Sequence, residues 1–187
     1  YLLAFDFFED KDVVEVDFLI APGMGSRADQ TVVTNDLVAT ARSRKDCVVV
    51  TSPARTDVVN VTSEATATTN ITTTTNTFTR SSFSIVAGNY LKMYDKFNDQ
   101  FIQIPASSSV AGLMAETDRV AASWFSPAGV NRGQLLGVTK LAFNPKQVDR
   151  DTLYKARVNP IVSLPGQGTV LFGDKTLLKR ASAFDRI

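Results

Sequence analysis

The residues best placed to do chemistry are the two glycines of the turn Pro22–Ser26, which reads Pro-Gly-Met-Gly-Ser. A glycine-rich turn that leads from a strand into a helix can bind phosphate through free backbone N–H groups. The dinucleotide-binding fingerprint requires a third glycine, but Ala28 stands there, which only its laxer form allows. The acidic residue expected after the second strand is also missing, because Thr51–Pro53 reads Thr-Ser-Pro. The turn therefore predicts a tight strand-to-helix connection, with a nucleotide- or sugar-phosphate-binding enzyme as the alternative.

The histidine and cysteine content of the chain excludes several kinds of catalytic and metal site. The chain has no histidine, which excludes Ser-His-Asp and Cys-His triads, histidine general bases and histidine-ligated zinc within it. The single cysteine, Cys47, cannot form an internal disulfide or a Cys-x-x-Cys metal site. Its apolar neighbours Val48–Val50 predict a buried, unreactive thiol. We therefore predict no catalytic residue, no cofactor and no metal ligand.

The composition and charge of the chain indicate which kinds of partner it can bind. The chain has 187 residues, of which 44% are hydrophobic and 21% charged, as in globular domains. Its 20 basic and 19 acidic residues give a net charge of +1, whereas general nucleic-acid or membrane-surface binders carry a clear basic excess. Its apolar runs are much shorter than the ~18 residues that span a bilayer. We expect neither a nucleic-acid partner nor membrane insertion.

The hydrophobic pattern predicts an α/β (α+β) protein whose mixed sheet begins with a βαβ unit and includes flanking helices and a β-hairpin. The unit comprises a strand at 16–21, a helix capped by Ser26 with Asp29 three residues later, and a strand at 47–50. Two apolar strands around one amphipathic helix are typical of a parallel sheet. Asn98-Asp99 predicts the hairpin turn. Further strands are expected at 83–87, 90–94, 101–104, 161–164 and 169–172, and a strand or buried segment at 136–143. Helices are expected at 107–121, capped by Ser107–Ser109, and at 146–157.

Residues 57–80 are predicted to form a threonine-rich variable surface loop. The run includes four consecutive threonines, Thr72–Thr75. Because threonine is β-branched, an edge β-ribbon is the alternative structure. The same run suggests a third functional class, an adhesin-like or decoration module.

The aromatic pair Trp124-Phe125 is predicted to anchor the core, with an exposed binding hot spot as the alternative. Trp124, Pro127 and Gly129 together are expected to fix the bend after the preceding helix.

An ordered series of short segments then points to a family. The segments are Gly88–Tyr90, Tyr94–Asp99, Ala111–Asp118, Trp124–Gln134, Gln147, Arg150–Tyr154, Asn159-Pro160, Val170–Thr176 and Phe184–Ile187. In this order they resemble the contractile tail sheath protein of T-even-like myophages. The resemblance is close over residues 83–187 and looser at the βαβ start.

The resemblance implies a structural role. Family members polymerise as stacked six-fold rings around a rigid tail tube, then shorten and drive the tube through the host envelope for genome ejection. The implied partners are copies of the same protein, the tail tube protein, and the baseplate and tail terminator proteins. The implied location is the tail sheath of the virion, assembled in the host cytoplasm. Residues 1–187 are expected to be an internal fragment containing the conserved core region, without the terminal arms that link subunits.

Four charged residues are the candidate contacts to a neighbouring subunit or to the tube: Arg132, Arg150, Asp151 and Arg186. The resemblance suggests that they form ion pairs across an interface. The alternative is that they cap local turns or are solvated.

Overall fold

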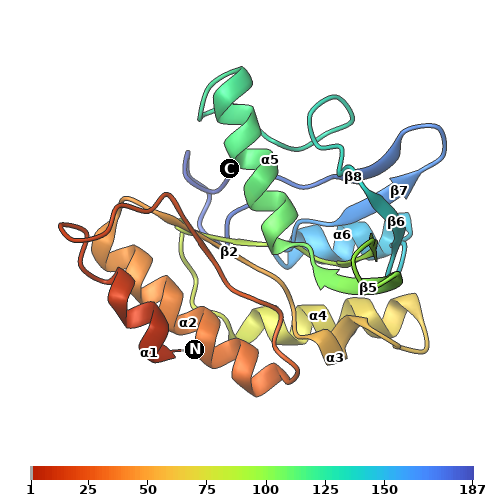
Figure 1. Ribbon diagram of the computed structural model, residues 1–187, viewed down its shortest axis with the longest axis horizontal. Coiled ribbons are helices and arrows are strands. Elements are labelled where there is room, and N and C mark those ends of the chain that lie inside the picture. The colour runs from red at the N-terminus through yellow and green to blue at the C-terminus, as the bar shows by residue number, and fades with distance from the viewer. Residues whose placement is uncertain (1) are drawn as a thin grey trace.

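The computed structural model describes residues 2–187 and confirms the predicted α/β fold (Figure 1). The βαβ unit forms as predicted, because strands β1 and β2 pair in parallel with Leu19 opposite Val49. Strand β3 pairs in parallel with the other side of β2. The Ser26 side chain caps α2 by accepting a hydrogen bond from the backbone N–H of Asp29 at 3.2 Å. The elements of this half are α1 (Leu2–Phe5), the 3-10 turn η1 (Asp6–Phe8), β1 (Phe18–Ile20), α2 (Arg27–Arg44), β2 (Val48–Thr51) and β3 (Ser84–Val86).

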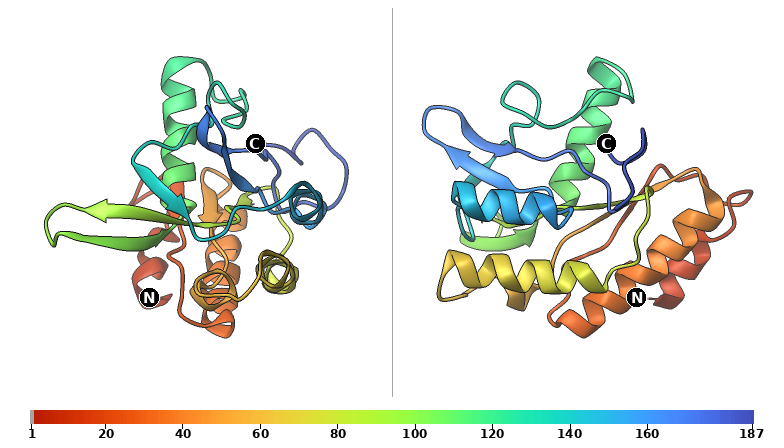
Figure 2. Two further views of the ribbon diagram at one scale, coloured as in Figure 1. Left: turned by 90° about the vertical axis from the view of Figure 1, so that its right-hand side faces the viewer. Right: turned by 180° about the vertical axis from the view of Figure 1, so that it is seen from behind.

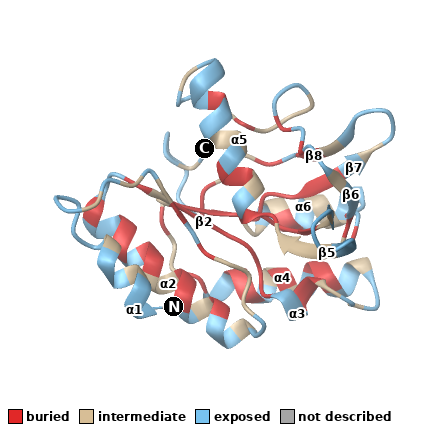
Figure 3. Ribbon diagram, viewed as in Figure 1, coloured by how far each residue is buried: buried red, intermediate tan, exposed pale blue. Residues whose placement is uncertain are grey.

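The parallel sheet is covered by helices on both faces. Val49 and Val50 are adjacent in β2 and point to opposite faces, as successive strand residues do. Val49 packs in a core cluster with residues of α2, and Val50 in another with residues of α5 (Ser107–Val120). Figure 3 shows the buried side of α2 facing this sheet. Cys47 is buried in the α2 cluster, as predicted, and burial raises the pKa of its thiol.

The threonine-rich loop prediction is wrong, and so is the edge ribbon. Residues 57–80 contain the end of the short helix α3 (Arg55–Val58) and all of helix α4 (Glu64–Thr77). Ser63 caps α4, and Ala67 and Ile71 bury its inner face at helical spacing. Threonine hydroxyls at 69, 72 and 73 donate to the carbonyl four residues earlier, so they do not pull the backbone out of the helix.

The predicted hairpin is confirmed as β4 (Tyr90–Asp95) and β5 (Gln100–Pro105). Its turn places Asp99 at φ 49°, a left-handed conformation that aspartate tolerates. Strand β6 (Val138–Leu141) pairs with the other side of β4, so the order is β5-β4-β6. Figure 2 shows the hairpin projecting from the body of the molecule.

The remaining elements follow the predicted order with one local correction. Helix α6 (Gln147–Lys155) precedes the antiparallel pair β7 (Ile161–Leu164) and β8 (Gly168–Leu171). The serines at 107–109 do not cap α5, which begins after Ala106 without a side-chain cap. Ser107 is buried and donates instead to the carbonyl of Ala21 at 3.2 Å, because this end of α5 is tied to the end of β1.

Buried asparagine and aspartate side chains join these parts into one stiff body. Asn89 donates to the carbonyls of Phe143 and Ile161, which belong to the chain after β6 and to β7. Asn159 exchanges two hydrogen bonds with the backbone of Lys175. Asp57 accepts from Arg27 at the start of α2 and from Thr74 in α4. Each of these side chains therefore connects elements that are far apart in the sequence.

Candidate interaction surfaces

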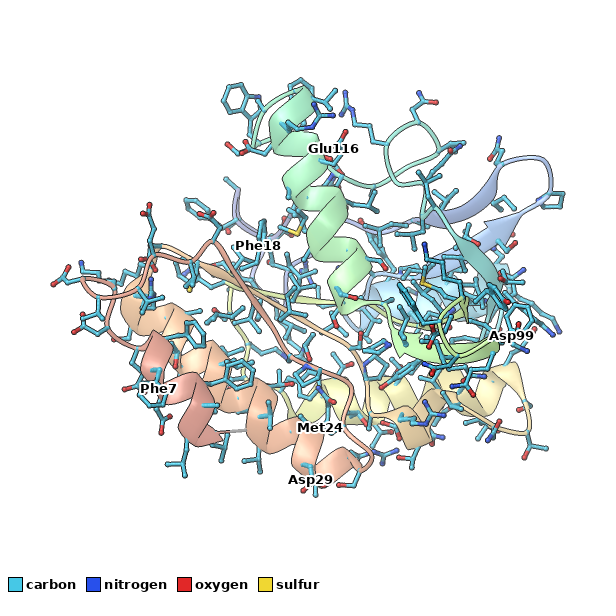
Figure 4. All side chains as sticks on the ribbon, in the orientation of Figure 1. Phe7, Phe18, Met24, Asp29, Asp99 and Glu116 are labelled. Atoms are coloured by element: carbon cyan, nitrogen blue, oxygen red, sulfur yellow. The ribbon has the colours of Figure 1, made fainter. Side chains whose placement is uncertain are left out.

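The turn Pro22–Ser26 is a tight connection, as predicted, and a side chain of the same chain accepts from one of its backbone N–H groups. The backbone N–H of Met24 donates to the Gln30 side chain at 2.6 Å. Gln30 is fully buried and donates in turn to Thr34 and Thr51. The Asp29 carboxylate, which accepts from the Ser26 hydroxyl, lies at the start of α2, where a phosphate would have to bind. This geometry favours a structural turn over a phosphate site, and Figure 4 shows Met24 and Asp29 at this end of α2.

Gly23 is required at this turn by a close approach. A Cβ atom built there would lie 1.8 Å from the hydroxyl oxygen of Tyr90, which is 1% exposed. That hydroxyl donates to the carbonyl of Pro53 at 3.1 Å. Tyr90, the first residue of β4, therefore packs against this turn and hydrogen-bonds to the segment that follows β2.

Stability above pH 10 is expected to depend on Tyr90. Burial raises the pKa of this phenol to about 12 from its ordinary value of 10, against a smaller lowering by the charge of Arg55 and with a still smaller rise from Asp57. Below pH 10 the phenol is protonated whether the chain is folded or unfolded. Between pH 10 and 12 the unfolded chain loses the proton first, so the free energy of unfolding should fall by up to about 2–3 kcal/mol.

Urea denaturation from pH 9 to pH 12 measures this effect against Tyr90→Phe. Lysine titration is common to both proteins, so only the wild type should show the additional fall. Parallel curves for the two proteins would contradict a buried, protonated phenol at position 90.

Neither a membrane segment nor a metal cluster is found in the described part of the chain. Among residues 2–187, no helix is long and apolar enough to cross a membrane. Within the same residues, no three His, Cys, Asp or Glu side chains gather as a metal site would require. The threonine-rich run gives no exposed loop for a decoration module, because α4 occupies it.

Three of the four predicted contact residues lie on one side of the molecule. Arg150 and Asp151, on α6, line a hollow of about 340 Å³ with Tyr154, Pro160 and Phe172. The Arg150 guanidinium lies 5.5 Å from the Phe172 ring centre and donates to the carbonyl of Pro145. Arg186 approaches the Asp174 carboxylate at 3.7 Å, and Tyr154 donates to the other oxygen of Asp174. Arg150 and Arg186 thus contact their own chain, while Asp151 is exposed.

Arg132 lies apart from the other three, at the far end of α5. Its guanidinium is 4.6 Å from the Phe125 ring centre, and it lines a hollow with Glu116 and Val120. Trp124 stacks on Phe125 with ring centres 6.3 Å apart. Figure 4 shows Glu116 on the part of α5 that extends beyond the body.

The prediction that Trp124 and Phe125 anchor the core is wrong. Trp124 is 80% exposed and Phe125 41%, because the chain leaves the body after α5. The bend is fixed without Trp124: Gly129 has φ 101°, and its N–H donates to the carbonyl of Leu171. Pro127 is buried there, as its predicted structural role requires. Trp124 and Phe125 therefore form an exposed aromatic pair.

A second exposed aromatic group was missed from the sequence. Phe97 in the hairpin turn is 88% exposed, and Tyr94 and Phe101 beside it are half exposed. Lys92 lies 5.1 Å from the Phe101 ring centre. The available signal was the alternation of lysine with aromatic residues from 92 to 97.

The fold resembles that of solved sheath structures. The anti-feeding prophage helical sheath in its contracted state has a similar structure, with a TM-score of 0.68 and 20% identity over 94% of this chain and 43% of that chain. The chain therefore shares its fold with the corresponding part of that sheath protein.

The sequence comparisons define the family. The model of the phage tail sheath protein central domain matches residues 1–177, so the chain belongs to the phage tail sheath family. It is 40% identical to the tail sheath protein of Enterobacteria phage T4 over 98% of the chain, and 36% identical to that of Vibrio phage KVP40 over 100%. The similarity thus includes the βαβ start and α4. The chain spans 29% and 30% of the lengths of these relatives.

Proposed function

We propose that this chain is the central part of a subunit that polymerises into the contractile tail sheath of a bacteriophage. The observation that carries the proposal is the 40% identity to the T4 tail sheath protein over nearly the whole chain. The subunits form six-fold rings stacked in a helix around the tail tube, between the baseplate and the tail terminator proteins. The sheath is assembled in the host cytoplasm and becomes part of the virion.

The proposed activity is mechanical and has no catalytic step. Contraction needs a rigid subunit that packs with its neighbours in two ways, the extended packing being kinetically trapped. The buried contacts of Asn89 and Asp57 support the rigid body, since they join separate elements of the fold. Exposed aromatic and charged groups on α5, α6 and the hairpin supply surfaces that repack. A few kcal/mol gained by each subunit then adds up over the whole sheath.

Electron microscopy of the full-length protein after expression tests this proposal. Tubes of sheath-like diameter, with six-fold symmetry in end views, are expected. Monomers that stay unassembled at every salt concentration and in the presence of tail tubes would contradict it.

Replacing Trp124 with alanine is expected to separate assembly from folding. The side chain is 80% exposed, so the free energy of unfolding should change by less than about 0.5 kcal/mol. Exposed tryptophans are frequent hot spots of interfaces, so tube formation should fall about tenfold or more. Urea denaturation and counting of tubes by microscopy measure the two effects.

Phe78→Ala is the contrasting variant, because Phe78 is 3% exposed and its loss should cost about 3–5 kcal/mol of stability. A normal tube yield from Trp124→Ala would show that Trp124 does not contribute to the contacts between subunits.

A further inference from the structure

Residues 5–17, here called the acidic segment, carry a concentrated negative charge at the surface. The segment has one lysine and six exposed acidic residues, Asp6, Glu9, Asp10, Asp12, Glu15 and Asp17. Within residues 2–187, none of these six carboxylates lies in an ion pair. Burial and, to a smaller extent, the nearby Asp6 raise the pKa of Asp36 on α2. Phe7 and Val13 are 79% and 76% exposed between the acids. The segment therefore offers charge and apolar area together.

The residues Arg55, Lys92, Tyr94, Phe101 and Lys140, here called the basic-aromatic face, carry the opposite charge on the outer side of the antiparallel sheet. Lys92 and Lys140 are register partners on β4 and β6, so two like charges lie directly opposite each other, an arrangement that destabilises a sheet. Arg55 joins them by donating to the carbonyl of Gln103 at 3.3 Å. Of these three cations, none has a carboxylate within ion-pair distance among residues 2–187.

The basic-aromatic face has the shape and the chemistry of a docking surface. Arg55, Lys92, Phe101 and Gln103 line a hollow of about 450 Å³. The Gln103 side-chain oxygen is buried without a hydrogen-bond partner in the part of the chain that the structure describes. Tyr94 and Phe101 are 51% and 53% exposed, and their rings pack at a tilt of 57° with centres 5.3 Å apart. An acidic partner with apolar side chains would neutralise the lysines and cover the rings.

The two surfaces cannot meet within one subunit. Figure 4 places Phe7, in the acidic segment, and Asp99, at the turn of the hairpin, at opposite ends of the molecule. The net charge of the chain is only +1, so the complementarity lies in how the charges are distributed. When complementary surfaces lie at opposite ends of one molecule, the first surface of one copy can bind the second surface of the next. Such head-to-tail contacts produce rings or helical filaments.

We propose that the acidic segment of one subunit docks on the basic-aromatic face of a neighbouring subunit. The inference rests on the proposed function, because it assigns one contact of the assembled sheath. Opposite charges on the two surfaces orient the approaching subunits and make the contact sensitive to salt. Exposed apolar side chains on both surfaces lose water when the contact forms.

A reciprocal charge exchange in the full-length protein tests the contact. The face variant carries Lys92→Glu and Lys140→Glu, and the segment variant carries Asp10→Lys and Asp12→Lys. The face variant sets acidic groups against the acidic segment, and the segment variant sets a run of three lysines at positions 10–12 against the lysines of the face. Each variant alone should form at least about tenfold fewer tubes than the wild type. An equimolar mixture of the two should recover tubes, since the lysines introduced beside Lys11 then face the glutamates of the face variant, and the unchanged segment meets the unchanged face. A chain with all four substitutions should also assemble by itself.

The control variant carries Lys155→Glu and Lys179→Glu, two exposed lysines outside both surfaces, and changes the net charge by the same amount as the face variant. It should assemble as the wild type does. Wild-type tube yield from the face or segment variant would overturn the contact. Loss of tubes that neither the mixture nor the four-substitution chain recovers would overturn it too, because the basic-aromatic face would then bind a different acidic partner. A wild-type protein that forms no tubes contradicts the proposed function itself, so the two failures are distinguishable.

Discussion

Replacing Asn89 with alanine is expected to lower the free energy of unfolding by about 3–5 kcal/mol. Asn89 is fully buried, and its side-chain amide donates to the carbonyls of Phe143 at 2.8 Å and Ile161 at 3.3 Å. Its side-chain oxygen accepts from the N–H of Tyr90 at 2.8 Å. Alanine leaves two buried carbonyls and one N–H without partners, and each such loss costs about 1–3 kcal/mol. The melting temperature should fall by on the order of 10 °C.

Asn144 provides a matched control for this prediction. Its side chain makes similar bonds with a backbone, donating to the carbonyl of Ser163 at 3.2 Å and accepting from its N–H at 2.9 Å. Asn144 is exposed, so water can replace both bonds in Asn144→Ala. We expect that variant to lose no more than about 1 kcal/mol. Equal losses for the two variants, measured by thermal and urea denaturation, would contradict the role given to Asn89.

Replacing Asp57 with alanine is expected to cost about 2–4 kcal/mol of stability. The Asp57 side chain is 4% exposed and accepts from Arg27 at 2.7 Å and from the Thr74 hydroxyl. Removal of the carboxylate leaves the Thr74 hydroxyl buried without its acceptor and Arg27 without its counter-charge. Because Asp57 ties α3 to α2 and α4, the loss should appear in global unfolding measured by urea denaturation.

The exposed pair Glu116–Arg119 shows what an ion pair contributes without burial. Its nitrogen–oxygen distance is 2.6 Å, yet the side chains are 55% and 72% exposed. Glu116→Ala should therefore change stability by only about 0–1 kcal/mol. A double-mutant cycle of Arg27→Ala with Asp57→Ala isolates the buried pair. A coupling no larger than that of Glu116 with Arg119 would show that burial adds nothing at Asp57.

The elements that could be predicted are those whose own residues determine them. Strands β1 and β2 are apolar on both faces, and Ser26 caps the helix between them, so this unit followed from local pattern. Helix α4 could not be predicted from its threonines, because its stability comes from the burial of Ala67 and Ile71 against distant residues such as Leu153. Tertiary packing of this kind overrides intrinsic propensity. The division of the strands into three sheets could not be predicted from the sequence either, since it depends on long-range contacts such as those of Asn89 with Phe143 and Ile161.

The interaction surfaces were less predictable than the fold. Residue type suggested that Trp124 is buried, but only the position of α5 relative to the body leaves it exposed. Arg132, Arg150, Asp151 and Arg186 were identified as charged residues near the resembling segments, yet three of the four contact other groups of their own chain. Lys92 and Lys140 are 48 positions apart in the numbering and become neighbours only through the pairing of β4 with β6. A surface formed in this way is not visible in the sequence.

Cryo-electron microscopy of the phage tail before and after contraction tests whether this chain is a rigid subunit of the sheath. We expect this chain to lie in the sheath layer in both states and to keep its fold as one rigid body. Between the two states, subunits should rotate and exchange surface contacts, while the buried partners of Asn89 and Asp57 stay unchanged. A density for this chain outside the sheath, or a fold that rearranges internally on contraction, would contradict the account.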